Sequence, residues 1–253
     1  MKVVANVAVG YNNIDVAAAR RRGVVVTNTP DVLTETTADF AWTLLMAAAR
    51  RGRGRPLLRA RASGRNGSGT LLWGADIHGK TLGVVGFGRI GRAVARRALG
   101  FNMRVLYQDA LRADAAAERE LRATRMDLEL PSSRRPTSVS LHTPLFARNA
   151  PPHERARLRL MKKSAVLVNA ARGPVGTRPR SCAPSRRGGS PARGSTCSKR
   201  SRTVHPGLVP LKNVVLAPHH RERIVRYAPG DGKPRRPQLP GRLDGKPPLT
   251  PVP

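Results

Sequence analysis

The stretch Gly79-Lys-Thr-Leu-Gly-Val-Val-Gly-Phe-Gly-Arg-Ile-Gly91 decides the fold. Its apolar residues from Leu82 to Val85 predict a short strand, which runs directly into the pattern Gly86-x-Gly88-x-x-Gly91. A helix is predicted from Arg92 to Leu99, and a second strand from Arg104 to Tyr107. The order of strand, glycine loop, helix and strand is the fingerprint of a dinucleotide-binding βαβ unit.

The three glycines have different physical tasks in such a unit. Gly86 permits the tight turn, Gly88 lets the backbone approach a pyrophosphate, and Gly91 lets the helix pack closely on the strand. The N-terminus of the helix offers free N–H groups and a partial positive charge to the phosphates. A lone pattern of this kind often marks only a glycine turn, but the flanking strands and helix favour a cofactor site.

Asp109 comes just after the second predicted strand. Its carboxylate can accept hydrogen bonds from both hydroxyls of an adenosine ribose, and it would repel a 2′-phosphate. The sequence therefore favours NAD over NADP as the cofactor. Taken alone, Asp109 could be a surface acid that closes a strand, but its position favours the ribose role.

Composition places broad limits on the protein. With 253 residues the chain can form one large domain or two small ones. Cys182 and Cys197 provide neither a disulfide framework nor the spacing of a metal site, so no metal is expected. The sequence shows neither a signal peptide nor an apolar run long enough to span a bilayer, so we expect a cytoplasmic protein without a membrane partner.

The charge of the chain is unusual. Lys and Arg number 47 against 15 Asp and Glu, which gives a formal net charge of +32 and would by itself suggest a nucleic acid partner. The basic residues cluster after Arg172 among Pro, Ser and Gly, and aromatic residues make up only 4% of the chain. Because stacking platforms need aromatic side chains, nucleic acid binding is the less favoured reading.

Further elements alternate along the chain. Strands are predicted over Val3–Val9, Val24–Thr27, Val139–Leu141, Ala165–Val168 and Val214–Ala217, and helices over Ile14–Arg22, Thr34–Arg50 and Ala113–Ala123. Apolar strands separated by helical lengths predict an α/β fold with a doubly wound parallel sheet.

Several segments do not fit this pattern. Residues 176–203 contain no Val, Leu, Ile, Met, Phe, Tyr or Trp, so we expect this segment to supply neither a buried helix nor a strand. Residues 131–138 and 146–157 likewise do not fit the pattern. The C-terminal tail, residues 220–253, is unreliable as a guide to the fold because it also departs from this pattern.

Several motifs together resemble the D-isomer-specific 2-hydroxyacid dehydrogenases, most closely their glyoxylate/hydroxypyruvate reductase branch. The resemblance rests on Ala8-Val-Gly-Tyr-Asn-Asn-Ile-Asp15, Val26-Thr-Asn-Thr-Pro-Asp-Val-Leu33, Thr37-Ala-Asp39, Gly79 to Gly91, Ser140-Leu-His-Thr-Pro-Leu145, Leu160-Met-Lys-Lys-Ser-Ala-Val-Leu-Val-Asn-Ala-Ala-Arg-Gly173, and Asn213 to His219. It implies a Rossmann domain over 29–219 and, over 1–28, the remnant of a flavodoxin-like substrate domain.

The resemblance also implies a role for each matching residue. Arg172 would bind the substrate's carboxylate and carbonyl oxygen, and His219 would exchange a proton with that oxygen during hydride transfer at C2. The N–H groups of Val9 and Gly10 would hold the carboxylate. The cofactor residues would be Phe87, Arg89 and Ile90 beside the three glycines, with Thr143, Pro144, Ala170 and Ala171 on the adenine and nicotinamide sides. The helix Thr34–Arg50 resembles a dimer-contact helix, so a homodimer is expected.

Alternatives stay open at two positions. Taken alone, Arg172 could be a plain charge at the end of a strand, and His219 a surface histidine beside His220. Their shared place at the ends of predicted parallel strands, where such sheets bind ligands, favours the catalytic roles.

The chain also departs from the family. It begins where family members already have much of their substrate domain behind them, so we expect an N-terminally truncated protein. The family's histidine is oriented by a glutamate in a Leu-Asp-Val-Phe-Glu stretch, yet no Asp or Glu occurs from Arg155 to Arg221. Without that carboxylate we expect an unstable chain with little activity. The alternative function is a non-catalytic dinucleotide-binding protein.

Reading-frame shifts in the gene are our hypothesis for these departures. Codons for Ser195-Thr-Cys-Ser-Lys199, read one nucleotide earlier, can encode Leu-Asp-Val-Phe-Glu. Segments beginning at Thr177, at His220 and at Thr137 can be restored to the family pattern in a similar way.

Overall fold

The computed structural model of the protein describes residues 1–11, 13–50, 74–126, 135–144, 161–162, 164–171, 193–195, 214–217 and 250–252. The chain divides into two compact units. Met1–Thr37 and His220–Pro253 form the smaller unit, and Ala38–His219 forms the larger one. The sequence predicted the boundary of the larger unit at residue 29 instead of 38, and treated the tail as separate from the N-terminal segment.

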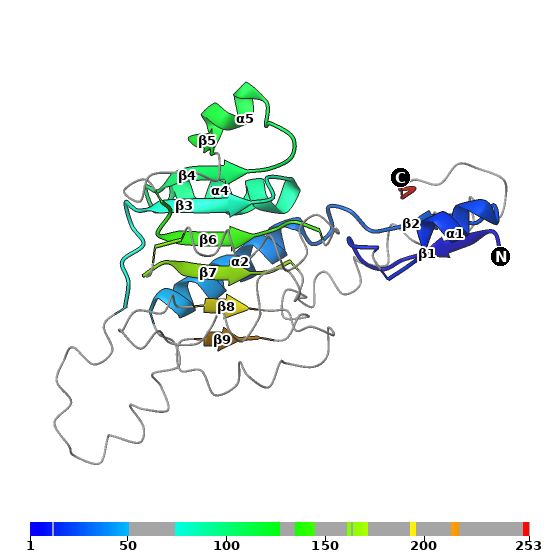
Figure 1. Ribbon diagram of the computed structural model, residues 1–253, viewed down its shortest axis with the longest axis horizontal. Helices are drawn as coiled ribbons and strands as arrows, with labels where there is room; N and C mark the ends of the chain where they lie inside the picture. Colours follow the sequence, from blue (N-terminus) through cyan, green and yellow to red (C-terminus); the bar gives the residue numbers. More distant parts are fainter. Residues whose placement is uncertain are drawn as a thin grey trace, which may run out of the picture. The chain divides into compact units, whose positions relative to one another are not determined.

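A parallel sheet of seven strands forms the larger unit, in the order β5-β4-β3-β6-β7-β8-β9 (Figure 1). The strands are β3 (Thr81–Val85), β4 (Arg104–Gln108), β5 (Ala123–Arg125), β6 (Ser138–Leu141), β7 (Val166–Asn169), β8 (Arg193–Ser195) and β9 (Val214–Leu216). The chain runs outward from β3 to β4 and β5, then returns to β6 on the other side of β3. This reversal creates a switch point at the carboxyl ends of β3 and β6, where ligands of such sheets bind. The predicted α/β Rossmann fold is confirmed.

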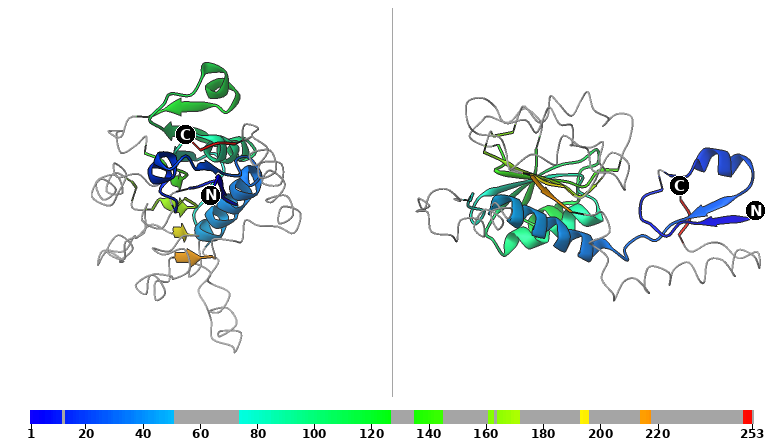
Figure 2. Two further views of the ribbon diagram at one scale, coloured as in Figure 1. Left: turned by 90° about the vertical axis from the view of Figure 1, so that its right-hand side faces the viewer. Right: turned by 90° about the horizontal axis from the view of Figure 1, so that it is seen from below.

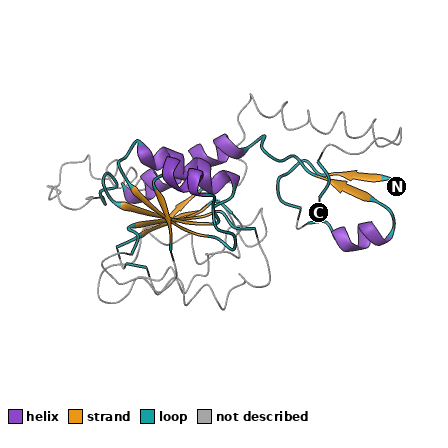
Figure 3. Ribbon diagram, turned by 90° about the horizontal axis from the view of Figure 1, so that it is seen from above, coloured by secondary structure: helices purple, strands orange, loops and turns teal. Residues whose placement is uncertain are grey.

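Two helices cover one face of this sheet, as Figures 2 and 3 show. They are α4 (Arg89–Leu99) and α2 (Thr34–Ala49). Small buried side chains, including Ala93, Ala95 and Ala98, let α4 lie close to the sheet. The apolar strand residues meet them in one core, where Leu82, Val84, Val105 and Tyr107 are fully buried.

Contacts between α2 and α4 join the two helices. Trp42 stacks on Phe101 with ring centroids 4.8 Å apart, and its indole N–H donates to the carbonyl oxygen of Val94 at 2.9 Å. Near the surface, the guanidinium of Arg97 donates to Asp39 at 2.6 Å. The shorter helix α5 (Ala115–Glu120) is capped at its N-terminus by Asp114, whose carboxylate accepts from the N–H of Ala117.

Several sequence expectations differ from the structure. Residues 176–203 were expected to supply no strand, but β8 lies between β7 and β9 in parallel register, with Leu167 opposite Arg193 and Arg193 opposite Val214. Backbone groups on both sides hold a central strand, so the pairing does not require large apolar side chains. The helix predicted over Ala113–Ala123 is also shorter than expected, because β5 begins at Ala123.

Ser138 lies within another segment that the sequence marked as anomalous, 131–138. It is buried and begins β6, opposite Leu82 and Val166.

The smaller unit contains β1 (Val3–Ala5), α1 (Val16–Arg21) and β2 (Val25–Thr27), and its two strands are parallel. Asp15 begins α1, since its carboxylate accepts from the N–H of Ala18 at 2.8 Å. Residues 250–252, close to the end of the chain, also pack here. The N–H of Val252 donates to the carbonyl oxygen of Val26 at 2.8 Å, next to an antiparallel bridge between Thr27 and Pro251.

Candidate functional site

The glycine loop joins β3 to α4 at the carboxyl edge of the sheet. Gly86 has a φ of +91°, in the region that favours glycine, and lies against the backbone of His142 and Thr143. A Cβ at Gly86 would meet that backbone at 2.7 to 2.9 Å. The turn after β3 therefore requires a residue without a side chain.

Gly88 and Gly91 differ in their surroundings. A Cβ at Gly91 would come within 2.1 Å of the carbonyl oxygen of Gly86, so the close approach of helix to loop depends on this glycine. A Cβ at Gly88 would meet nothing within 4 Å. Gly88 is the N-cap of α4 and provides no side-chain cap, so the start of this helix has no capping side chain that would compete with an anion.

Asp109 lies directly against this loop. One carboxylate oxygen accepts from the N–H of Phe87 at 2.6 Å, and the other accepts from the N–H of Leu111 at 3.2 Å. The structure thus brings together the acid after β4 and the glycine loop after β3, as the sequence predicts. The N–H of Phe87, which was expected to help cradle a pyrophosphate, is here bonded to Asp109.

Aromatic and charged contacts hold Phe87 in place. Its ring stacks on Tyr107 with centroids 4.2 Å apart, and the guanidinium of Arg92 lies over the Phe87 ring, 5.9 Å from its centroid. Arg92 also donates to the carbonyl oxygen of Phe87 and to Asp114. The backbone at the centre of the loop is therefore fixed before any ligand binds.

A second network anchors the segment after Asp109. The Tyr107 hydroxyl donates to Glu118 at 2.5 Å and accepts from the N–H of Ala113 at 3.0 Å, while Arg112 donates to both oxygens of Glu118. Burial raises the pKa of Tyr107, and the hydrogen bond from Arg112, followed by that from Tyr107, lowers the pKa of Glu118. Sequence reasoning missed this network. The only available signal was an acid within the predicted helix after Asp109.

The ends of β6 and β7 complete the carboxyl edge. The N–H of His142 donates to the carbonyl oxygen of Val85 at 2.7 Å, which places Thr143 and Pro144 beside the glycine loop. The His142 ring contacts the Ser140 hydroxyl at 2.8 Å, and burial lowers the pKa of His142 to about 4. After β7, the Asn169 side chain accepts from the N–H of Ala171 at 3.0 Å and shapes the turn at Ala170 and Ala171.

The structure describes two of the four predicted substrate residues. Val9 and Gly10 belong to the smaller unit, in the loop after β1. Arg172 and His219 lie outside the described residues. Within the described ranges, no group of three His, Cys, Asp or Glu side chains could hold a metal ion, and no helix is long and apolar enough to cross a membrane.

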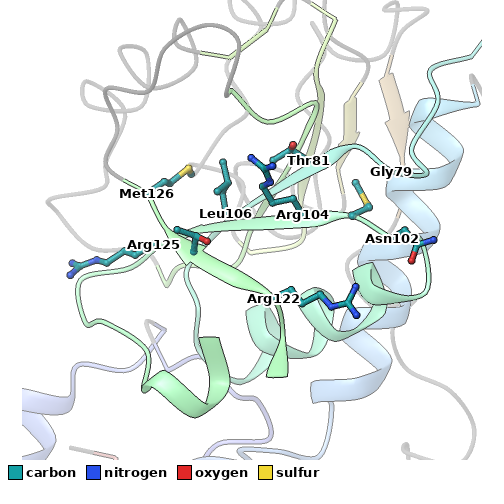
Figure 4. A pocket seen from close by; sticks show the side chains of 10 residues that line it. Gly79, Thr81, Asn102, Arg104, Leu106, Arg122, Arg125 and Met126 are labelled. Carbon is teal, nitrogen blue, oxygen red and sulfur yellow. The ribbon is translucent and has the colours of Figure 1, made fainter. Parts of the chain in front are cut away.

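A cavity of about 900 Å³ lies elsewhere, against β3, β4 and β5 (Figure 4). Its described lining contains none of the residues of the glycine loop. Arg104, Arg122 and Arg125 contribute to it, but their side chains point in different directions and do not converge on one point. The remaining described lining residues are Gly79, Thr81, Asn102, Met103, Leu106, Thr124 and Met126.

Comparison with known proteins gives consistent results. The family described as "D-isomer specific 2-hydroxyacid dehydrogenase, NAD binding domain" matches residues 42–220. A glyoxylate reductase of Thermococcus kodakarensis is 47% identical over 228 residues, which are 87% of this chain and 66% of the relative. A glyoxylate reductase of Korarchaeum cryptofilum is 44% identical over 229 residues, with the same coverage. The chain thus spans 66% of the length of these curated relatives.

Solved structures agree with this assignment. A glyoxylate reductase from Paecilomyes thermophila superimposes with a TM-score of 0.85 at 28% identity, covering 100% of this chain and 75% of that one. An NADPH-dependent glyoxylate/hydroxypyruvate reductase from Sinorhizobium meliloti, solved with NADP and malonate, gives a TM-score of 0.86 at 27% identity, covering 100% and 77%. Glycine loop, Asp109, sheet order and sequence similarity agree, and the chain belongs to the D-isomer-specific 2-hydroxyacid dehydrogenase family.

Proposed function

We propose that this chain is an oxidoreductase that transfers a hydride between NAD(H) and C2 of a small 2-oxo or 2-hydroxy acid, of the glyoxylate or hydroxypyruvate reductase type. The hydrogen bond from the Phe87 N–H to Asp109 carries this proposal, because it holds the acid that would bind the ribose against the loop that would hold the pyrophosphate. The names of the relatives support the substrate class.

The residues at the carboxyl edge fit a dinucleotide. The open space at Gly88 and the uncapped start of α4 suit a pyrophosphate, and the Asp109 carboxylate suits two ribose hydroxyls. When bound, the nicotinamide supplies the hydride. Thr143, Pro144, Ala170 and Ala171 would border the cofactor, since they follow β6 and β7 at the same edge.

Four residues would handle the substrate. The N–H groups of Val9 and Gly10 hold its carboxylate, and the planar guanidinium of Arg172 binds the carboxylate and the carbonyl oxygen. His219 gives a proton to that oxygen during reduction and takes it back during oxidation. Because no Asp or Glu occurs from Arg155 to Arg221, the imidazolium form of His219 lacks a charge partner from this segment, and we expect slow turnover.

Binding and turnover test these points separately. Calorimetric titration of the full chain with NADH should show binding, and glyoxylate should then cause a slow loss of NADH absorbance. Failure to bind NADH would contradict the proposed function. Rapid turnover would contradict only the proposal that the missing carboxylate matters.

Cofactor preference belongs to the same proposal. Asp109 should make NADH bind more tightly than NADPH, because its charge opposes a 2′-phosphate. The variant Asp109→Ser should narrow the ratio of the two dissociation constants by about tenfold, which corresponds to about 1.4 kcal/mol. An unchanged ratio would show that Asp109 does not set the preference.

A homodimer is part of the proposal as well. The resemblance of α2 to a dimer-contact helix supports it. Sedimentation velocity of the full chain across a range of concentrations should show a species of twice the monomer mass, and a monomer throughout would contradict the homodimer.

A further inference from the structure

In the loop after β1, two successive carbonyl groups accept hydrogen bonds from one neighbouring segment. The carbonyl oxygen of Ala8 accepts from the N–H of Thr29 at 3.1 Å. The next one along the chain, that of Val9, accepts from the side-chain amide of Asn28 at 2.9 Å. Two successive peptide planes are therefore held by the same neighbouring segment, residues 28 and 29, which follows β2.

These bonds fix the direction of two N–H groups. In a planar trans peptide the C=O and the following N–H point to opposite sides. With the Ala8 and Val9 carbonyls turned toward residues 28 and 29, the N–H groups of Val9 and Gly10 point away from that segment. Neither of these N–H groups donates to another described residue, and Val9 is 36% exposed. Two adjacent N–H groups that no described residue accepts from, on an accessible loop, suit an anion.

Asn28 is in turn held by the end of the chain. Its N–H donates to the carbonyl oxygen of Thr250 at 3.3 Å, and its own carbonyl oxygen accepts from the Thr250 hydroxyl at 2.6 Å. This bond spans 222 positions of sequence. Asn6 supports the far side of the loop, because its side-chain amide donates to the carbonyl oxygen of Gly10 at 3.0 Å.

We propose that Asn28 and Thr250 are positioning residues that aim the N–H groups of Val9 and Gly10 at the substrate's carboxylate. The C-terminal residues are therefore part of the substrate site. This inference rests on the proposed function, which assigns carboxylate binding to Val9 and Gly10, and it adds the residues that fix the direction of those two donors.

The test uses oxalate as the probe and the full ¹⁵N-labelled chain with saturating NADH. Oxalate should shift the amide resonances of Val9 and Gly10. In Asn28→Asp the side chain can no longer donate to the Val9 carbonyl and instead repels it, so the dissociation constant of oxalate should rise about tenfold. Thr250→Val should raise it by about threefold, and Thr250→Ser, which keeps the hydroxyl, should restore wild-type affinity.

Kinetics give an independent readout. KM for glyoxylate should rise in Asn28→Asp and Thr250→Val, with kcat changed by less than about twofold. The matched control is Asn13→Ala, which removes an exposed asparagine of the same unit whose side chain has no hydrogen bond to a described residue. It should leave both constants unchanged. Loss of the dispersed amide resonances of the smaller unit in Asn28→Asp would mean that this variant does not fold. The positioning role is then tested by comparing oxalate binding in Thr250→Val and Thr250→Ser.

The outcomes separate the two proposals. If oxalate shifts the Val9 and Gly10 resonances but binds equally well to Asn28→Asp and Thr250→Val, the positioning role is overturned and the proposed function stands. If oxalate leaves those resonances unmoved in the wild-type chain, the substrate contact assigned to Val9 and Gly10 is wrong, and the positioning role fails with it.

Discussion

Individual glycines of the loop have separable roles at the scale of the residue. Gly88→Ala should change the free energy of unfolding by less than about 1 kcal/mol, since a Cβ there meets nothing. It should weaken NADH binding at least about tenfold, because the methyl group would occupy the space that we propose for the pyrophosphate. Thermal unfolding and NADH titration of the same variant measure both effects.

Gly91→Ala is the matched comparison. Its Cβ would overlap the carbonyl oxygen of Gly86, so we expect a loss of about 3 kcal/mol of stability together with the loss of NADH binding. Wild-type NADH affinity in Gly88→Ala would contradict the pyrophosphate role of that residue.

His142 makes stability depend on pH. Its pKa is lowered from 6.5 to about 4 by burial, so the folded chain keeps the ring neutral while the unfolded chain takes up a proton near pH 6.5. The contribution of His142 to stability is complete above pH 6.5 and falls as the pH is lowered from 6.5 toward 4. The slope should stay below the one-proton limit of about 1.4 kcal/mol per pH unit, because the folded and unfolded chains both titrate partly within this interval.

Urea unfolding at several pH values measures this slope. His142→Gln, which cannot titrate, should flatten it over the same interval. An equal slope in the variant would assign the pH dependence to other groups.

Sequence alone predicted the residues whose roles depend on local pattern. Gly86, Gly88, Gly91 and Asp109 lie together because one βαβ unit contains them all. It could not predict the partners of Asn28, because Thr250 is 222 positions away and meets it only in the folded smaller unit. Arg172 and His219 fall outside the described residues and stay predictions.

At the scale of the element, the contact between α2 and α4 depends on burial far more than on charge. Trp42→Ala should cost about 3 to 5 kcal/mol, because it removes a buried ring stacked on Phe101 and leaves a cavity. Asp39→Ala should cost at most about 1 kcal/mol, since Asp39 is largely exposed and its pairing with Arg97 is screened by solvent. Chemical denaturation gives both values, and a larger effect for Asp39→Ala would reverse this ranking.

The strands show where pattern reasoning works and where it fails. Apolar residues made five strands predictable from the sequence, namely β3, β4, β6, β7 and β9. Each predicted strand agrees with the structure within a residue or two at each end. β8 has no large apolar residue, so a rule based on side-chain hydrophobicity could not find it. Its pairing with β7 and β9 comes from backbone hydrogen bonds, which every non-proline residue can make.

At the scale of the whole molecule, the position of β8 is relevant to the hypothesis that reading-frame shifts produced the segments that depart from the family pattern. β8 ends at Ser195, where the alternative reading frame can begin Leu-Asp-Val-Phe-Glu. We predict that the nucleotide sequence of the gene encodes this stretch in the shifted frame. Sequencing the gene checks this directly, and absence of the glutamate codon from every frame would refute the hypothesis. Restoring the frame should then raise the rate of glyoxylate reduction.

The return of Thr250 and Val252 to β2 has a consequence for biosynthesis. During synthesis β1 and β2 emerge from the ribosome before the larger unit, whereas Pro251 and Val252, which pair with β2, emerge after it. The larger unit, whose residues 38–219 are contiguous, can fold while still tethered, whereas the smaller one stays incomplete until Thr250 to Val252 have been added. A stop codon just before Thr250 would leave every residue of the seven-stranded sheet in the chain and still remove the hydrogen bonds by which Thr250 holds Asn28.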